Sequence, residues 1–287
     1  KRITVKDGFF FFFNEFLVMC RGFFILHKIV IMEKTLLSLY DYSGMWSKPF
    51  WDAGWNVIQM DLKHGQDINQ FQSVEDVWDY GINDVHGILA APPCTDFTVS
   101  GAQFWKAKDE DGRTAEAIKL VNQVQRFADL FTPTDPDYDE PFFWVMENPV
   151  GRLNTLLPEL GAPMYFNPWE YAGYLKPGKD VLLRLDQIRL KNGIGVTNEE
   201  SAFVVEWEAY TKKTGLWGNF NKNLIKNPVP AVKCSKQGSF TQRLGGKSTK
   251  TKEERSHTPM GFAMAFFNAN ENYTGYLYDD QQMNLFE

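Results

Sequence analysis

The residue with the clearest chemical potential in this sequence is a cysteine that follows two prolines. Cys94 comes directly after Pro92-Pro93, at the end of the apolar run 85–91. Proline fixes φ and lacks an N–H, so a strand that ends in two prolines cannot continue or turn at once into a helix. We therefore expect Cys94 in a rigid loop at the carboxyl end of a strand, where open α/β sheets bind ligands. A thiol there is a candidate nucleophile, although a buried, inert side chain is the commoner fate of cysteine.

A carboxyl group holds the equivalent place after a later apolar run. Glu147 follows the run 141–146 and begins a Glu-Asn-Pro sequence. A glutamate that apolar side chains shield from water has a raised pKa and can donate a proton at neutral pH. We expect Trp144 and Phe143 to provide this shield. The alternative role is a helix cap in front of the proline.

A sheet must bring these residues together. Apolar runs of strand length alternate with segments of helical periodicity, which predicts an α/β protein with a mostly parallel sheet and helices on both faces. Strands are expected at 35–40, 55–60, 85–91 and 141–146, and helices at 50–54, 74–80 and 113–131. Asp41, Asp61, Cys94 and Glu147 each follow one of these strands. Because parallel strands end on the same edge, the four side chains are expected along one rim of the sheet.

Composition limits the possible functions. The chain has 287 residues and a net charge of −6, which argues against binding nucleic acid with the whole surface. A basic surface that binds nucleic acid must therefore be local, and the carboxyl-terminal third contains a candidate cluster. The alternative is that these basic residues only form a solvated surface. The cluster consists of Lys222, Lys226, Lys233, Lys236, Arg243, Lys247, Lys250, Lys252 and Arg255.

The cysteines predict a reduced, cytoplasmic protein without a metal site. Cys20, Cys94 and Cys234 are far apart in the sequence, and none belongs to a pair with zinc-ligand spacing. The aromatic segment 1–31 is interrupted by charged residues before it reaches the length of a membrane span. We expect it to be a dispensable extension in front of the folded protein.

Several motifs occur in the order found in the C5-cytosine DNA methyltransferases, and the sequence resembles this family over residues 35–270. The motifs are Tyr42-Ser43-Gly44, Asp61, Gly65-Gln66-Asp67-Ile68, Pro92-Pro93-Cys94, Glu147-Asn148-Pro149 and the segment 256–270. The compact phage and prophage members of the family, some linked to restriction-modification, are the nearest subgroup. The resemblance implies a Rossmann-like methyltransferase fold that uses S-adenosylmethionine and a small, irregular carboxyl-terminal recognition region.

The resemblance also assigns roles to residues. Cys94 would add to C6 of cytosine and Glu147 would act on its Watson–Crick edge. The cofactor would be bound by Tyr42, Ser43, Gly44, Asp61, Asp67 and Pro92. Asn148, Lys213, Arg243, Lys247 and Arg255 would contact the base or the DNA, whose target base would have to be flipped out of a duplex. For Asp61, a strand-end or helix-cap role is the alternative.

The expected organisation follows from these motifs. A catalytic domain would span 32–217, with an insertion at about 176–208, followed by a basic recognition region at 218–255 and a closing helix and tail at 256–287. The nearest basic strand before the recognition region is expected at 210–214. We expect a monomer, without membrane contact, in the cytoplasm of a bacterial host.

Two departures from the family pattern keep other functions open. The usual Gly-Gly after Gly44 is replaced by Met45-Trp46, and no Gln-x-Arg-x-Arg strand is present. The recognition region is also small. The alternatives are the same chemistry on RNA or on a free cytidine nucleotide, or a non-catalytic protein that binds S-adenosylmethionine or DNA.

Overall fold

The computed structural model of the chain describes residues 15–20, 23–28, 34–82, 84–132, 142–175, 208–229 and 256–273. The chain divides into two compact units, Lys1–Glu33 and Lys34–Glu287. In the first unit, β1 (Glu15–Cys20) and β2 (Phe23–Lys28) form an antiparallel pair that the sequence did not lead us to expect. None of the helices in the described ranges combines the length and the apolar character that crossing a membrane requires.

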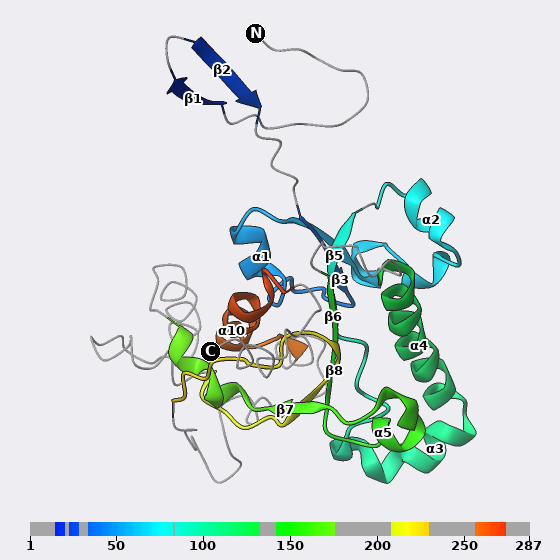
Figure 1. Cartoon of the computed structure of the whole chain (residues 1–287). Coiled ribbons are helices and arrows are strands. Elements are labelled where there is room, and N and C mark those ends of the chain that lie inside the picture. Colours follow the sequence, from blue (N-terminus) through cyan, green and yellow to red (C-terminus); the bar gives the residue numbers. More distant parts are fainter. Residues whose placement is uncertain are drawn as a thin grey trace, which may run out of the picture. The chain divides into compact units, whose positions relative to one another are not determined.

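The second unit is built on a six-stranded sheet with the order β4-β3-β5-β6-β8-β7 (Figure 1). Its strands are β3 (Thr35–Leu39), β4 (Asn56–Met60), β5 (Val85–Ala90), β6 (Phe143–Pro149), β7 (Met164–Phe166) and β8 (Thr214–Asn219). The first four in spatial order are parallel, whereas β8 is antiparallel to both of its neighbours. The chain passes from β3 to β4 on one side and then crosses to β5 on the other, so a topological switch point lies between β3 and β5.

Helices cover both faces of this sheet. They are α1 (Lys48–Asp52), α2 (Val74–Asp79), α3 (Trp105–Glu110), α4 (Arg113–Phe131), α5 (Leu153–Leu156) and α10 (Met260–Asn270). Short 3₁₀ turns occupy Leu62–His64, Ile68–Gln70, Val99–Phe104, Pro158–Leu160, Pro168–Glu170 and Ala172–Tyr174. In Figure 1, α2 and α4 lie on one side of the sheet, and α1 and α10 lie on the other. The unit therefore has the Rossmann-like α/β fold that the sequence predicts.

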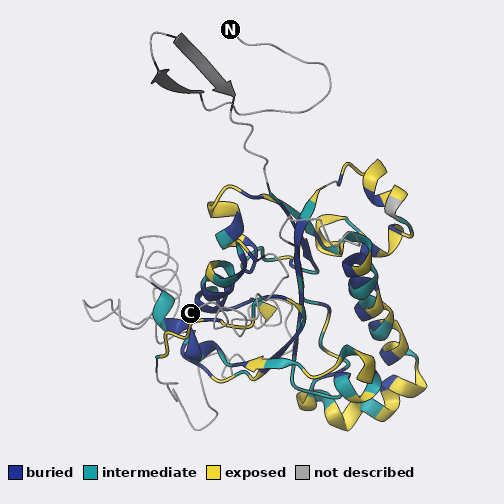
Figure 2. Cartoon of the chain, in the orientation of Figure 1, coloured by how far each residue is buried: buried dark blue, intermediate teal, exposed yellow. Residues whose placement is uncertain are grey.

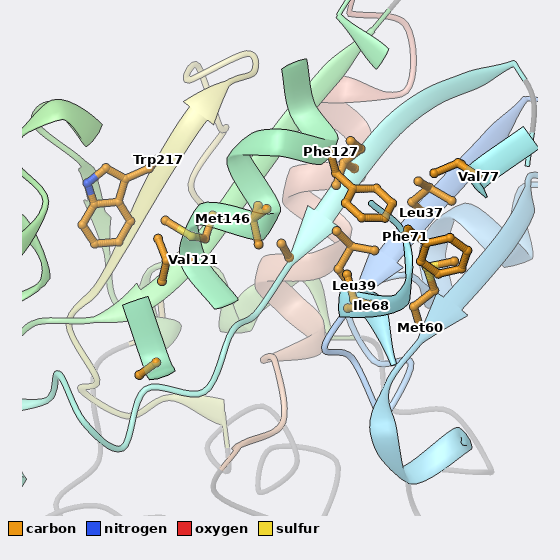
Figure 3. Packing of buried hydrophobic residues seen from close by; sticks show 14 of the residues in the cluster. Leu37, Leu39, Met60, Ile68, Phe71, Val77, Val121, Phe127, Met146 and Trp217 are labelled. Carbon is orange, nitrogen blue, oxygen red and sulfur yellow. The ribbon is translucent and has the colours of Figure 1, made fainter. Parts of the chain in front are cut away.

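The alternation of side chains along the strands builds two cores. Leu37 and Leu39 of β3 belong to the cluster that includes Val121 and Phe127 of α4 (Figure 3). Leu36, which points to the other face of β3, belongs to the opposite cluster with Phe262 and other aromatic residues of α1 and α10. The same division shows on α4, which is buried toward the sheet and exposed on its outer side (Figure 2). Both strand faces are apolar because both are covered, as in other parallel sheets.

Two predicted strands differ from the observed ones. The strand expected at 141–146 continues through Glu147 to Pro149, because β8 pairs with it along this stretch. The basic strand expected at 210–214 is wrong: β8 begins at Thr214, and Lys212 and Lys213 precede it. Glu147 thus lies within a strand and is held by its ladder, which gives it a more rigid position than the loop site that the sequence suggested.

Candidate active site

The loop after β3 is folded around the carboxylate of Asp41. This buried side chain accepts hydrogen bonds from Ser38 Oγ (2.9 Å), Ser43 Oγ (3.1 Å), the Gly44 amide (2.9 Å) and Ser47 Oγ (3.3 Å). Sequence reasoning placed Asp41 on the rim but gave it no role. Its many donors show that it organises the loop, and the serines at 38, 43 and 47 were the available signal.

Gly44 allows this loop to pass close to β4. It has φ +64°, a conformation that glycine adopts without steric cost. A Cβ at this position would lie 2.7 Å from Gln59 Nε2, which donates to the Asp41 carbonyl at 2.9 Å. The path of this loop therefore requires glycine at position 44.

Tyr42 is the exposed side chain of this loop, at 44% of its full accessibility. Lys63 Nζ lies 4.3 Å from the centre of its ring, and the ring of His64 lies 5.1 Å away. His64 Nε2 is also 3.2 Å from the Tyr42 carbonyl oxygen. The loop after β3 and the turn after β4 are thus in contact at the rim.

Asp61 and Asp67, two of the residues predicted to bind the cofactor, both cap short turns. Asp61 Oδ1 accepts from the Lys63 amide at 2.8 Å, and Asp67 Oδ1 accepts from the Asn69 amide at 2.9 Å. Both residues remain at least partly exposed at the same edge. A capping carboxylate keeps lone pairs for ribose hydroxyls or an amino group, so the arrangement is compatible with either role.

The loop of Cys94 is tied directly to the strand of Glu147. Asn148, which is fully buried, donates from Nδ2 to the carbonyl oxygen of Pro92 at 3.2 Å. The Cys94 carbonyl accepts from the amides of Phe97 (3.0 Å) and Thr98 (3.1 Å), which closes a turn that begins at Cys94. Cys94 is partly buried. Because β5 and β6 are parallel neighbours, the loop of Cys94 leaves β5 beside the last residues of β6, where Glu147 lies.

Glu147 lines a small pocket between the sheet and α10. The pocket has a volume of about 10 Å³, and its lining is Glu147, Phe166, Pro168, Lys212, Thr214, Thr258, Pro259 and Phe262. Glu147 Oε2 is inaccessible to solvent and has no hydrogen-bond partner among the described residues. Burial raises the pKa of this carboxyl; the charge of Lys212 opposes the rise and that of Asp41 adds to it.

The side chains that cover Glu147 are not the predicted ones. Phe143 packs against Phe50 and Phe266, and Trp144 belongs to the core on the opposite face of the sheet. Phe143 shares a strand face with Glu147 but lies four residues away, about 13 Å along the strand, and Trp144, three residues away, faces the opposite side, so neither provides the shield. Glu147 is partly buried, and the cover of its carboxyl group comes from Phe166 and Phe262 instead.

Of the two lysines in front of β8, the structure places Lys212 and not Lys213 beside the glutamate. Lys212 lines the Glu147 pocket, whereas Lys213 Nζ lies 4.3 Å from the centre of the exposed Tyr165 ring. Sequence reasoning selected Lys213 and missed Lys212. The alternation of side chains in an extended segment explains the difference, but only the register of β8 could show which lysine faces inward.

Glu208 fixes the start of α10, which forms one wall of the pocket. Its two carboxylate oxygens each accept a hydrogen bond of 2.8 Å from the amides of Met260 and Gly261. Burial raises the pKa of Glu208, and the two amides act against this rise. Sequence reasoning placed this residue at the end of an insertion of unknown purpose.

Three predicted DNA-binding residues, Arg243, Lys247 and Arg255, lie outside the described residues. Within the ranges that the structure describes, no group of three or more histidine, cysteine, aspartate or glutamate side chains is arranged to hold a metal ion.

Comparison with known proteins adds little to this geometry. No protein-family model matches the sequence, and no curated protein matches it. Among solved structures, the chain is similar to the methyltransferase EhMeth of Entamoeba histolytica, at 12% identity and a TM-score of 0.26. The match covers 76% of this chain and spans about three fifths (61%) of that one.

Proposed function

We propose that this protein is an S-adenosylmethionine-dependent methyltransferase that methylates C5 of cytosine in DNA. The observation that carries the proposal is the hydrogen bond from Asn148 to Pro92, which joins the strand of the partly buried Glu147 to the loop of Cys94. Addition to a pyrimidine ring requires a nucleophile and a proton donor, and here the two groups are carried by one of two neighbouring parallel strands and by the loop that follows the other.

The cofactor would bind across the switch point between β3 and β5. The Asp41-organised loop and Pro92 flank this point, and Asp61 and Asp67 supply acceptors at the next strand end. These groups fit a nucleoside, which needs acceptors for its ribose hydroxyls and amino group. When bound, S-adenosylmethionine would supply an electrophilic methyl group.

The protein's own residues would then activate the base. The thiolate of Cys94 adds to C6, and the electron pair of the C5–C6 double bond moves toward N3. Glu147 in its protonated form donates a hydrogen bond or a proton to N3, which stabilises the negative charge that develops there. Its raised pKa favours that protonated form. C5 would become nucleophilic and accept the methyl group, with S-adenosylhomocysteine as the leaving product. A water molecule would then take the C5 proton, the Cys94 thiolate would leave C6 as the C5–C6 double bond re-forms, and N3 would return its proton to Glu147.

Lys212 favours a cytosine over an apolar group in the Glu147 pocket. Its ammonium lines the same pocket as Glu147 and the hydroxyl-bearing Thr214 and Thr258. A pyrimidine edge offers both donors and acceptors, and this set can satisfy both kinds. The pocket of about 10 Å³ holds roughly one water, so a base could enter only if the start of α10 and the turn Pro168–Glu170 move apart.

Methyl transfer from labelled S-adenosylmethionine tests the proposal. Cytosine-containing DNA, RNA and free cytidine nucleotide are incubated separately with the wild type, with Cys94→Ser, and with Cys20→Ser as the matched control. We expect label in DNA with the wild type and Cys20→Ser, and none above background with Cys94→Ser. Equal incorporation by Cys94→Ser would exclude the thiol mechanism. Label in RNA or nucleotide alone would change the substrate, and cofactor binding without any transfer would indicate a non-catalytic protein.

A further inference from the structure

Lys108 of α3 is a buried lysine whose ammonium reaches the loop that carries Cys94. The residue is 5% exposed. Nζ donates to the carbonyl oxygen of Thr95 at 2.5 Å and forms an ion pair of 3.1 Å with Asp96 Oδ1. A buried ammonium is costly unless it is paired and hydrogen-bonded, so these two partners determine where this side chain lies.

Both partners belong to the turn that begins at Cys94. The amides of Phe97 and Thr98 donate to the Cys94 carbonyl, and the ring of Phe97 is fully buried in the core shared with α4. The Thr95-Asp96 peptide is the part of the turn that these bonds leave unconstrained. Lys108 binds it through a backbone oxygen and a side-chain oxygen together.

The segment after β6 holds the other side of this turn. The Arg152 amide donates to the Phe97 carbonyl at 2.9 Å, and Arg152 Nε donates to the Asp96 carbonyl at 3.2 Å. A Cβ at Gly151 would lie 1.9 Å from the Phe97 oxygen, so only glycine allows this approach. The loop of Cys94 is therefore fixed from α3 on one side and from the end of β6 on the other.

We propose that Lys108 is a positioning residue for the Cys94 thiol, which acts by immobilising the Thr95-Asp96 peptide. The inference rests on the proposed function in one respect, that Cys94 is the reacting group. A lysine that served only to neutralise Asp96 would need no contact with the Thr95 carbonyl. The bond to that carbonyl is the feature that ties the ammonium to the backbone next to Cys94.

Hydrogen exchange of the full-length protein, without cofactor or nucleic acid, tests the anchoring step. The variants are Lys108→Met, Lys108→Arg and the double variant Asp96→Asn/Lys108→Met. Lys106→Met is the matched control, because Lys106 lies on the same helix and its side chain is 90% exposed. In Lys108→Met, the amides of 95–98 should exchange about 10-fold to 100-fold faster, as expected for loss of a charged hydrogen bond. Lys106→Met should leave them unchanged.

The double variant separates positioning from charge balance. It removes both members of the ion pair, so it should unfold at nearly the wild-type denaturant concentration even if Lys108→Met does not fold. Its Thr95 carbonyl still lacks the lysine donor, so fast exchange at 95–98 should persist. Wild-type exchange there in the folded double variant would overturn the proposal, because Lys108 would then act only as a counter-ion for Asp96.

Methyl-transfer kinetics supply the second readout. In the double variant, kcat should fall by about 100-fold, the effect of a small misplacement of a reacting group, while KM for the cofactor stays within about twofold. Lys108→Arg keeps a donor and should retain most of the activity. An unchanged kcat would also overturn the positioning role. If the wild type transfers no methyl group, the proposed function fails, but the exchange result still decides whether Lys108 anchors the turn.

Discussion

Asn148 of β6 donates its side-chain amide to the Pro92 carbonyl, 3.2 Å away and 56 residues earlier in the chain. This bond is buried and joins two adjacent parallel strands beyond the last pair of their ladder, Ala90 and Met146. It therefore fixes the Cys94 loop relative to Glu147 at a place where the sheet itself no longer does so.

Asn148→Ala should loosen the Cys94 loop. The change removes one buried hydrogen bond and leaves the Pro92 carbonyl without its donor, which costs about 1–3 kcal/mol of unfolding free energy. We also expect methyl transfer to fall by at least about tenfold. Denaturant unfolding and initial rates measure the two effects. The exposed Asn223→Ala serves as control, and equal rates for both variants would argue against a role for this bond in the site.

Glu147→Gln should abolish methyl transfer and change how stability depends on pH. The pKa of Glu147 is raised in the folded protein, so the folded state binds this proton more tightly than the unfolded chain does. The wild type therefore loses unfolding free energy as pH rises above about 4.3, the ordinary value for glutamate, toward the raised pKa. The variant lacks this loss, and above pH 4.3 it should become progressively more stable relative to the wild type.

Unfolding curves of both proteins at several pH values check this prediction. The raised pKa of Glu208 contributes to both proteins, so it cancels in the difference. Asn223→Ala, which changes a side chain that does not titrate at an exposed position, should show a constant difference from the wild type. A constant difference for Glu147→Gln as well would mean that its carboxyl does not titrate differently on folding.

Gly44→Ala should weaken cofactor binding and stability. Alanine at φ +64° is strained by about 1–2 kcal/mol, and its Cβ would also displace Gln59 from the loop. Gly54→Ala is a matched control, because Gly54 also has a positive φ, +89°, but its Cβ would meet nothing within 4 Å. Calorimetric titration with S-adenosylmethionine should show loss of affinity for Gly44→Ala only. Equal affinity in both variants would place the cofactor elsewhere.

Glu208→Ala should destabilise the start of α10. It removes the acceptors of two helix amides and is expected to cost about 1–2 kcal/mol, in the range measured for helix caps. Thermal unfolding measures the loss, and exposed Glu75→Ala should leave the midpoint unchanged. Because Thr258 and Pro259 precede this helix and line the Glu147 pocket, the variant should also lose activity. If the thermal unfolding midpoint fell while activity stayed at the wild-type level, the position of the start of α10 would not matter for methyl transfer.

The sequence predicted the part of the fold that consists of buried parallel strands and the long helix between two of them. The helix expected at 113–131 is α4 with the same bounds, because its apolar spacing is regular and uninterrupted. The sequence did not predict β7 or the position of β8. β7 has only three residues and β8 contains two glycines, so neither has the apolar run that marks a covered parallel strand.

The residues missed at the candidate site share one property. Lys108, Lys212 and Glu208 all depend on contacts with segments far along the chain or on strand register. A lone lysine or glutamate in a polar stretch resembles a solvated surface residue. Asp61 and Cys94 could be selected because proline and strand ends mark their places locally.

The late pairing of β6 has a consequence for synthesis of the protein on the ribosome. β6 is complete at residue 149, but its partner β8 spans 214–219. Until those residues emerge, a nascent chain has the apolar strand Phe143–Pro149 as an open sheet edge, ready to pair with another copy. Chaperone binding during this interval of about 65 residues, or several seconds of elongation, would protect the edge that later holds Glu147.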